Sequence, residues 1–280
     1  MRNLRIVLLI VLIGLPLLSS AAMAQTPKIG PGWLDCPRCQ NGRDRAEMRA
    51  KYQVEGHAFN PRDLSGVWGN NGMELDLMTF PPLTAWGKQQ YDATRTDETP
   101  DGTPISNSKD GMLICDPLGY PRLSAYNYGF QFAMLPDRVV QFFEWGHTWR
   151  DIWTDGRQLP ADPPQPRWNG YAVGKWEGDT FVIESNGYDE RSWLSEDRRD
   201  RRWGFPHSDE LKVVERYKRT SFGTLEAELT IVDPKTYKKP WTTRGTINLT
   251  PGTELWEYMC VPSESELFNQ QYVRPAAGSK

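Results

Sequence analysis

Four ionisable side chains lie close together in the stretch Val139–Arg157, which reads VVQFFEWGHTWRDIWTDGR. They are Glu144, His147, Arg150 and Asp151. A carboxylate beside an imidazole can hold the ring in one tautomer and raise its pKa toward neutrality, as a general acid or base requires. A nearby guanidinium can stabilise negative charge that develops during a reaction. These residue types therefore fit proton transfer that needs no cofactor.

The elements that must position these side chains are two short strands. Runs rich in Val, Phe, Trp and Ile meet at Trp145-Gly146, which predicts a β-hairpin. Because successive side chains on a strand point to opposite sides, each strand has two faces. A bulge at Gly146 would reverse the assignment of these faces. The face that we expect to point inward carries Val140, Phe142, Glu144, His147, Trp149, Asp151 and Trp153, whereas Arg150 and Ile152 lie on the other.

A second interior carboxylate is expected on the predicted strand Leu211–Thr220. Leu211, Val213 and Tyr217 alternate with charged residues there, and Glu215 shares their apolar face. A charge buried among apolar side chains is costly unless it is paired or used. Glu215 is therefore a candidate site residue.

Two interpretations of these groups stay open. In the first, His147 moves a proton and Glu144 or Glu215 orients it, while Arg150 or Arg157 stabilises negative charge. In the second, Glu215 is a core carboxylate that Arg150 or Arg157 neutralises, and His147 bonds a neighbouring strand.

Aromatic residues of the same region are candidates for the walls of a binding cavity. They are Phe142, Trp149, Trp153 and Tyr217, which offer large apolar faces. Arg157, at the end of the predicted turn Asp155-Gly156-Arg157, could reach an anionic group of the ligand.

Motifs for metals and common cofactors are missing from the sequence. The three histidines, His57, His147 and His207, lie far apart, and Glu144-x-x-His147 straddles a predicted turn. If a metal were bound, His147, Glu144 and His207 would be the ligands to check. The sequence has no G-x-S-x-G elbow, phosphate-binding glycine loop or dinucleotide fingerprint. We therefore expect no metal and no cofactor.

Short runs of β-branched and aromatic residues, separated by turn residues, recur along most of the chain. With Gly66-Val-Trp68 as the first strand, about ten strands are predicted, all antiparallel. Because no helix of crossover length separates them, we expect an all-β, lipocalin-like barrel with short peripheral helices. Thr84 is a candidate N-cap for one such helix, Ala85–Ala93. The other predicted strands are Phe130–Leu135, Val139–Trp145, Thr148–Thr154, Tyr171–Trp176, Thr180–Ser185, Leu211–Thr220, Thr224–Val232, Thr242–Leu249 and Leu255–Val261.

The N-terminus has the features of a secretory signal peptide over residues 1–24. Two arginines precede the apolar run Ile6–Leu18, and Ala22-Met23-Ala24 is an A-x-A cleavage site. The apolar run is too short to cross a membrane as a helix, and no cysteine follows the cut for a lipid anchor. We therefore expect an exported, periplasmic or extracellular protein without a transmembrane anchor, with an N-terminal extension over 25–60 and a single barrel domain over 61–280.

Four cysteines in an exported chain favour disulfides, because the compartment is oxidising and their number is even. Cys36 and Cys39 could form a local bridge or a redox pair. Cys115 and Cys260 lie in separate segments and could join the end of the domain to its start.

The charge balance argues against nucleic acid as a partner. The chain has 33 basic and 36 acidic residues, and removal of Arg2 and Arg5 with the signal peptide leaves 31 basic residues against 36 acidic ones. A mildly negative protein has no excess positive potential for a polyanion. A small-molecule ligand or substrate is the expected partner, and the sequence does not indicate an oligomeric state.

Several short motifs occur in a fixed order over nearly the whole predicted domain. In this order the chain resembles a large group of exported, mostly uncharacterised bacterial proteins, and the resemblance implies a location in the cell envelope and one undivided fold. Gly66-Val-Trp68 is also similar to the first strand of lipocalin-like barrels, in which the Trp closes one barrel end. The motifs are Asp-Leu-Ser-Gly-x-Trp at Asp63–Trp68, Glu-x-x-His at Glu144–His147, Asp-Gly-Arg at Asp155–Arg157, Gly-x-Trp-Glu-Gly-Asp-Thr at Gly174–Thr180, Leu-x-Val-x-Glu-Arg at Leu211–Arg216 and Glu-Tyr-x-Cys at Glu257–Cys260.

The leading hypothesis from the sequence is an exported β-barrel that binds one small apolar or aromatic molecule in its interior. The alternative is a cofactor-independent lyase, isomerase or hydrolase that uses His147 with Glu144 or Glu215. A purely structural envelope protein, with a filled interior, is the third class.

Overall fold

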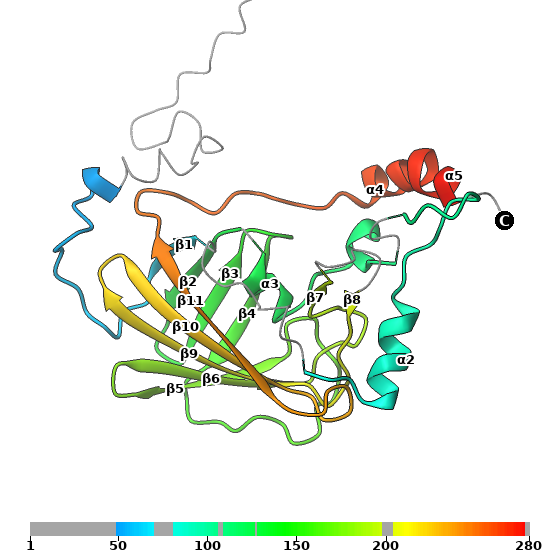
Figure 1. Ribbon diagram of the computed structural model, residues 1–280. Coiled ribbons are helices and arrows are strands. Elements are labelled where there is room, and N and C mark those ends of the chain that lie inside the picture. The colour runs from blue at the N-terminus through cyan, green and yellow to red at the C-terminus, as the bar shows by residue number, and fades with distance from the viewer. Residues whose placement is uncertain (1–48, 70–80, 106–108, 127, 198–203, 278–280) are drawn as a thin grey trace, which may run out of the picture. The chain divides into compact units, whose positions relative to one another are not determined.

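Within the described part of the chain, nine strands close into a barrel in the order β1-β11-β10-β9-β6-β5-β4-β3-β2 (Figure 1). The computed structural model describes residues 49–69, 81–105, 109–126, 128–197 and 204–277, all within the unit Cys36–Lys280. The barrel strands are β1 (Gly66–Gly69), β2 (Phe130–Met134), β3 (Arg138–Phe143), β4 (Thr148–Trp153), β5 (Tyr171–Glu177), β6 (Thr180–Asn186), β9 (Lys212–Ser221), β10 (Thr224–Val232) and β11 (Trp241–Leu249).

Short elements surround the barrel. β7 (Ser195–Glu196) and β8 (Gly204–Phe205) form a small separate sheet. The helical elements are α2 (Ala85–Ala93), the 3-10 helix η3 (Gly111–Ile114), α3 (Arg122–Ala125), α4 (Pro262–Phe268), the π-helix η4 (Asn269–Val273) and α5 (Arg274–Ala277). In the described residues, no helix is both long and apolar enough to cross a membrane. The predicted all-β barrel with short peripheral helices is confirmed.

Strand pairing differs from the sequence prediction at one joint of the barrel. β4 and β5 run parallel and pair through Ile152 with Ala172 and Trp153 with Val173, whereas every other barrel pair is antiparallel. A parallel pair needs a crossover connection, which the segment 154–170 provides without a helix. The prediction of wholly antiparallel pairing is therefore wrong at this joint.

The last predicted strand, Leu255–Val261, does not join the barrel. Only an isolated bridge pairs Tyr258 with Trp145, and the Gly146 N–H donates to the Tyr258 carbonyl at 2.8 Å. This segment instead leads from β11 to the C-terminal helices (Figure 1).

Alternating burial along β9 and β10 shows how the sequence builds the barrel interior. Val213, Glu215 and Tyr217 are fully buried in β9, and their neighbours in β10 include Leu229 and Ile231, which are equally buried. Charged residues occupy the alternate positions and face outward. The predicted inward face of both strands is confirmed.

Helix α2 begins and ends where the sequence predicts. The Thr84 hydroxyl accepts a hydrogen bond from the Gly87 N–H at 3.0 Å, which caps the first turn. A Cβ at Gly87 would lie 2.2 Å from the Thr236 carbonyl oxygen, so only glycine lets the helix approach the barrel this closely.

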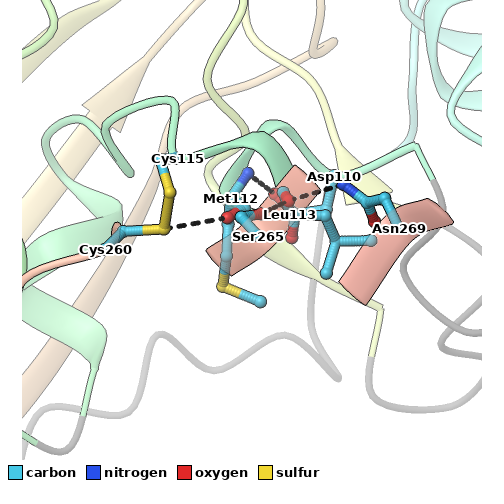
Figure 2. The surroundings of a disulfide bond; sticks show 7 residues. All are labelled: Asp110, Met112, Leu113, Cys115, Cys260, Ser265 and Asn269. Carbon is cyan, nitrogen blue, oxygen red and sulfur yellow. Dashed lines mark hydrogen bonds between the residues drawn. A yellow bond between two sulfur atoms is a disulfide. The ribbon is translucent and has the colours of Figure 1, made fainter. Parts of the chain in front are cut away.

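A disulfide joins Cys115 to Cys260, as the sequence predicts, with a Cα–Cα distance of 5.4 Å (Figure 2). Helix α4 lies against η3 beside it, because the Ser265 hydroxyl and the Asn269 amide both donate to the Leu113 carbonyl. The C-terminal segment is therefore held to the loop before α3. Cys36, Cys39 and the predicted signal peptide lie outside the described residues, as does most of the N-terminal extension.

We expect the double variant C115S/C260S to be less stable than the wild-type protein. The two cysteines are 145 residues apart, and a bridge that closes a loop of this order destabilises the unfolded chain by about 5 kcal/mol. Urea-induced unfolding, followed by tryptophan fluorescence, measures the difference. An unchanged midpoint would show that the bond contributes nothing to stability.

Candidate functional site

The faces of the central hairpin are opposite to those expected from the sequence. Gln141 pairs with Arg150 across β3 and β4, and both side chains are buried inside the barrel. Trp149 is 59% exposed and its partner Phe142 is 38% exposed, so the aromatic face points outward. The grouping of residues by face was right, but the side that faces the interior was wrong.

The loop between β3 and β4 differs from the predicted turn, which explains why the inward side of the hairpin was wrongly assigned. The strands end at Phe143 and resume at Thr148, and the connecting loop contains Gly146 and His147 at φ values of 69° and 48°. The loop is therefore longer than the tight turn that the sequence suggested, and it leaves His147 exposed. The orientation of the hairpin is set by the buried partner of Arg150, which lies on another strand.

That partner is Glu215, which is fully buried in the barrel interior. The two terminal nitrogens of Arg150 donate to the two carboxylate oxygens of Glu215 at 2.9 and 2.6 Å, and Nε of Arg150 donates to Gln141 Oε1 at 2.9 Å. This is a bidentate, charge-assisted pair inside an apolar core. The interpretation that Arg150 neutralises Glu215 therefore agrees with the geometry.

Two tyrosines complete the surroundings of Glu215. The hydroxyls of Tyr120 and Tyr217 donate to Glu215 Oε2 at 2.6 and 3.2 Å, and the Arg150 guanidinium lies 3.6 Å from the centre of the Tyr120 ring. Burial, followed by the negative charge of Glu215, raises the pKa of both tyrosines, which therefore stay protonated donors. For Arg150, burial alone would lower the pKa, but the charge of Glu215, its hydrogen bond and the two tyrosines together outweigh burial, and the pKa is raised.

His147 has neither of its expected carboxylate partners. Its backbone N–H donates to the Glu144 carbonyl at 3.3 Å, but its imidazole forms no hydrogen bond or ion pair with any residue that the structure describes. Glu144 Oε2 accepts from the Gly129 N–H at 3.3 Å, and Glu215 is held by Arg150. The expected pairing of His147 with Glu144 or Glu215 is wrong, and a catalytic role for these residues stays a prediction.

A hollow of about 770 Å³ opens on the outside of the barrel, where β4 and β5 meet. Five residues proposed from the sequence contribute to its wall: Trp149, Arg150, Asp151, Trp153 and Arg157. Phe142, Glu144, His147, Glu215 and Tyr217 do not line it. We call this hollow the wall pocket. Residues that sequence reasoning missed complete it, chiefly Arg167, Trp168, Asn169 and Tyr171.

The parallel joint explains why a pocket forms there. β4 and β5 share only two residue pairs, and before Ile152 and Ala172 the two segments separate. Across this gap the Asn169 amide donates to the Trp149 carbonyl at 3.2 Å and to the Thr148 hydroxyl at 3.3 Å. At the base of the pocket, hydrogen bonds from the Asn169 side chain thus take the place of backbone hydrogen bonds between the two strands. The segment 154–170, rich in proline, carried no periodic signal that would have identified its last residues as site residues.

Guanidinium groups cover several aromatic rings around the wall pocket. Arg157 lies 3.5 Å from the centre of the Trp153 ring, and Arg167 lies 3.9 Å from that of Tyr171. Asp155 accepts from both the backbone and the side chain of Arg157, which confirms the predicted Asp-Gly-Arg turn. Trp149 is the most exposed of these rings and leaves an open apolar face.

A buried histidine, His207, lies near β8. His207 Nε2 is 2.8 Å from the Ser192 hydroxyl, and Nδ1 is 3.2 Å from the Ser208 carbonyl. Because a carbonyl can only accept, Nδ1 carries a proton. The Ser192 hydroxyl lies within hydrogen-bond distance of both Nε2 and the Asp189 carbonyl, at 2.8 and 3.1 Å. Burial lowers the pKa of His207, partly offset by the bond to Ser208. Ser192 is itself buried, so this pair holds the loop against the barrel.

The described residues contain no group of three or more His, Cys, Asp or Glu side chains placed to hold a metal ion. His147 and His207, two of the ligands named from the sequence, have the separate surroundings given above.

Comparison with known proteins gives no relative for this chain. No protein-family model, curated protein or solved structure matches it.

We expect the variant R150M to lose about 3–5 kcal/mol of stability, because it leaves the buried charge of Glu215 unpaired. The double variant R150M/E215Q should recover part of this loss, since it removes the unpaired charge and keeps an acceptor for Tyr120. Urea-induced unfolding of the wild type, both single variants and the double variant measures the coupling. Losses that simply add would contradict a direct interaction between Arg150 and Glu215.

Stability should also fall as the pH is lowered through the range in which an unfolded histidine takes up a proton. The folded protein disfavours protonated His207, so the unfolded state binds more protons below the ordinary histidine pKa of about 6.5. Between about pH 7.5 and about pH 5.5, the free energy of unfolding should therefore decrease, by at most about 1.4 kcal/mol per pH unit.

Urea-induced unfolding at several pH values tests this. H207Q should flatten the dependence, whereas H147Q, at an exposed position, should leave it unchanged. An equally steep dependence in H207Q would assign the effect to other groups.

Proposed function

We propose that this protein is an exported β-barrel that binds one small aromatic molecule in the wall pocket. The observation that carries the proposal is a hollow of about 770 Å³ bordered by Trp149, Trp153, Trp168 and Tyr171. Ligand pockets are typically concave, of a few hundred cubic ångströms or more, with aromatic walls and few polar groups. The exposed indole of Trp149 offers a flat apolar face on which an aromatic ring gains stacking energy.

The wall pocket fits a ligand better than the barrel interior does. Phe132, Gln141, Ile183, Glu215 and Leu229 are all fully buried, so no water-sized space touches them. The described interior is occupied by the Arg150–Glu215 pair, whose charges are satisfied by each other, and by Tyr120, which donates to the same carboxylate. The interior binding that the sequence suggested is thus replaced in our proposal by binding at the outer wall.

Binding is favoured over acid–base catalysis for a geometric reason. His147 does not line the wall pocket and its imidazole has no carboxylate partner among the described residues. The carboxylate that does line the pocket, Asp151, is held in an ion pair with Arg138, whose Nε lies 3.0 Å from Oδ1. A general base needs a free proton acceptor within hydrogen-bond reach of the substrate.

Export is supported by two features. The N-terminal 24 residues have the order of charges, apolar residues and small residues of a signal peptide. A disulfide such as Cys115–Cys260 forms and persists in an oxidising compartment.

We expect the full-length chain to be secreted with loss of residues 1–24, and mass spectrometry of the secreted protein measures this.

Binding can be tested with 2-naphthylmethanol, a neutral aromatic probe, by saturation-transfer difference NMR and calorimetry. We expect the probe to bind the full mature chain, and W149A to weaken its binding about fivefold, because one stacking partner is lost. Trp149 is largely exposed, so the fold should persist.

Y272A serves as the matched control, since Tyr272 is 61% exposed and does not line the wall pocket. Its affinity for the probe should equal that of the wild type. Absence of binding, or equal weakening by both variants, would overturn the proposal.

A further inference from the structure

Three arginines line the wall pocket, and two of them are already neutralised. The Arg150 side chain points into the barrel, where both terminal nitrogens donate hydrogen bonds to Glu215. Arg157 donates to Asp155 from Nε at 3.0 Å and from Nη2 at 2.6 Å. Arg167 is the third, and among the described residues its side chain has no acidic partner and no hydrogen-bond acceptor.

The position of Arg167 is fixed by its surroundings. Its backbone N–H donates to the Gly187 carbonyl at 3.0 Å, and its own carbonyl accepts from the Asp189 N–H at 3.1 Å. The guanidinium is stacked on the ring of Tyr171, whose hydroxyl donates to the Gln165 carbonyl at 2.9 Å. A guanidinium stacked on a ring keeps its in-plane N–H donors available to a ligand.

The pocket therefore has an uncompensated positive charge. Asp151, the acidic residue in its lining, is bound by Arg138, so it does not neutralise Arg167. Asp155 is occupied by Arg157. A ligand that enters the wall pocket can contact the exposed indole of Trp149 and the guanidinium of Arg167, whose N–H donors have no acceptor among the described residues.

On this basis, and resting on the proposed function, we infer that the wall pocket takes an aromatic carboxylate, whose ring packs on Trp149 and whose carboxylate pairs with Arg167. The planar fork of a guanidinium matches the two oxygens of a carboxylate, which a neutral hydroxyl cannot replace. Arg167 is thus the residue that selects charge, and Trp149 is the residue that binds the ring. Lysine at position 167 would keep the charge but lose the bidentate geometry.

The test compares two probes with the same ring, 2-naphthoate and 2-naphthylmethanol, by calorimetry on the full mature chain. We expect the wild type to bind 2-naphthoate roughly two- to fivefold more tightly, the range for an ion pair with an exposed side chain such as Arg167. R167Q should abolish this preference and leave the affinity for 2-naphthylmethanol unchanged, and R167K should recover only part of it. The preference should also decrease as salt is added.

R244Q is the matched control, because Arg244 is an exposed arginine that is neutralised by Glu228 and does not line the wall pocket. It should retain the preference for 2-naphthoate. If both probes bind equally well to the wild type, or if R167Q keeps the preference, the assignment of Arg167 is overturned while the proposed function stands. If neither probe binds, the proposed function itself fails. A preference lost equally in R244Q and R167Q would indicate general electrostatic attraction and would also overturn the assignment.

Discussion

The ion pair between Arg150 and Glu215 determines how the rest of this barrel is arranged. Two buried charges are tolerated only because each terminal nitrogen of Arg150 meets one carboxylate oxygen of Glu215 and Tyr120 donates to the same carboxylate. Pairing requires Arg150 to face inward. Since neighbours on a strand alternate, Trp149 and Trp153 must then face outward, and the same constraint that fills the interior creates an aromatic surface on the wall.

Much of the barrel follows from patterns that can be seen in the sequence. The alternation around Leu229 in β10 and around Glu215 in β9 identifies both the strands and their inner faces, because buried, mostly apolar residues alternate there with mostly polar or charged residues that face outward. The parallel joint between β4 and β5 could not be predicted in this way. Periodicity reports that a segment is a strand, but not which strand it pairs with when the connection is as long as 154–170.

The candidate site was predictable only in part, for a related reason. Sequence reasoning selected Trp149, Trp153 and Arg157, which do meet in one pocket, yet it placed both tryptophans inside the barrel. Aromatic residues are usually buried and arginines usually exposed, but here Trp149 faces outward and Arg150 faces inward. This arrangement is favourable only because Arg150 pairs with Glu215, which is distant in the sequence. Arg167 was missed because it follows a proline-rich loop, where neither alternation nor a motif distinguishes a binding residue from a surface charge.

The short parallel contact of β4 with β5 has a mechanical consequence for the barrel. A cylinder opens most readily where few backbone bonds cross. Within the described barrel this joint is one of two, with that of β1 and β11, that have only two residue pairs, here Ile152 with Ala172 and Trp153 with Val173. A ligand that contacts Trp149 on β4 and Tyr171 on β5 would bridge the two strands. While it is bound, it would resist their separation. Ligand binding would then shift the equilibrium between the opened and the closed barrel toward the closed one.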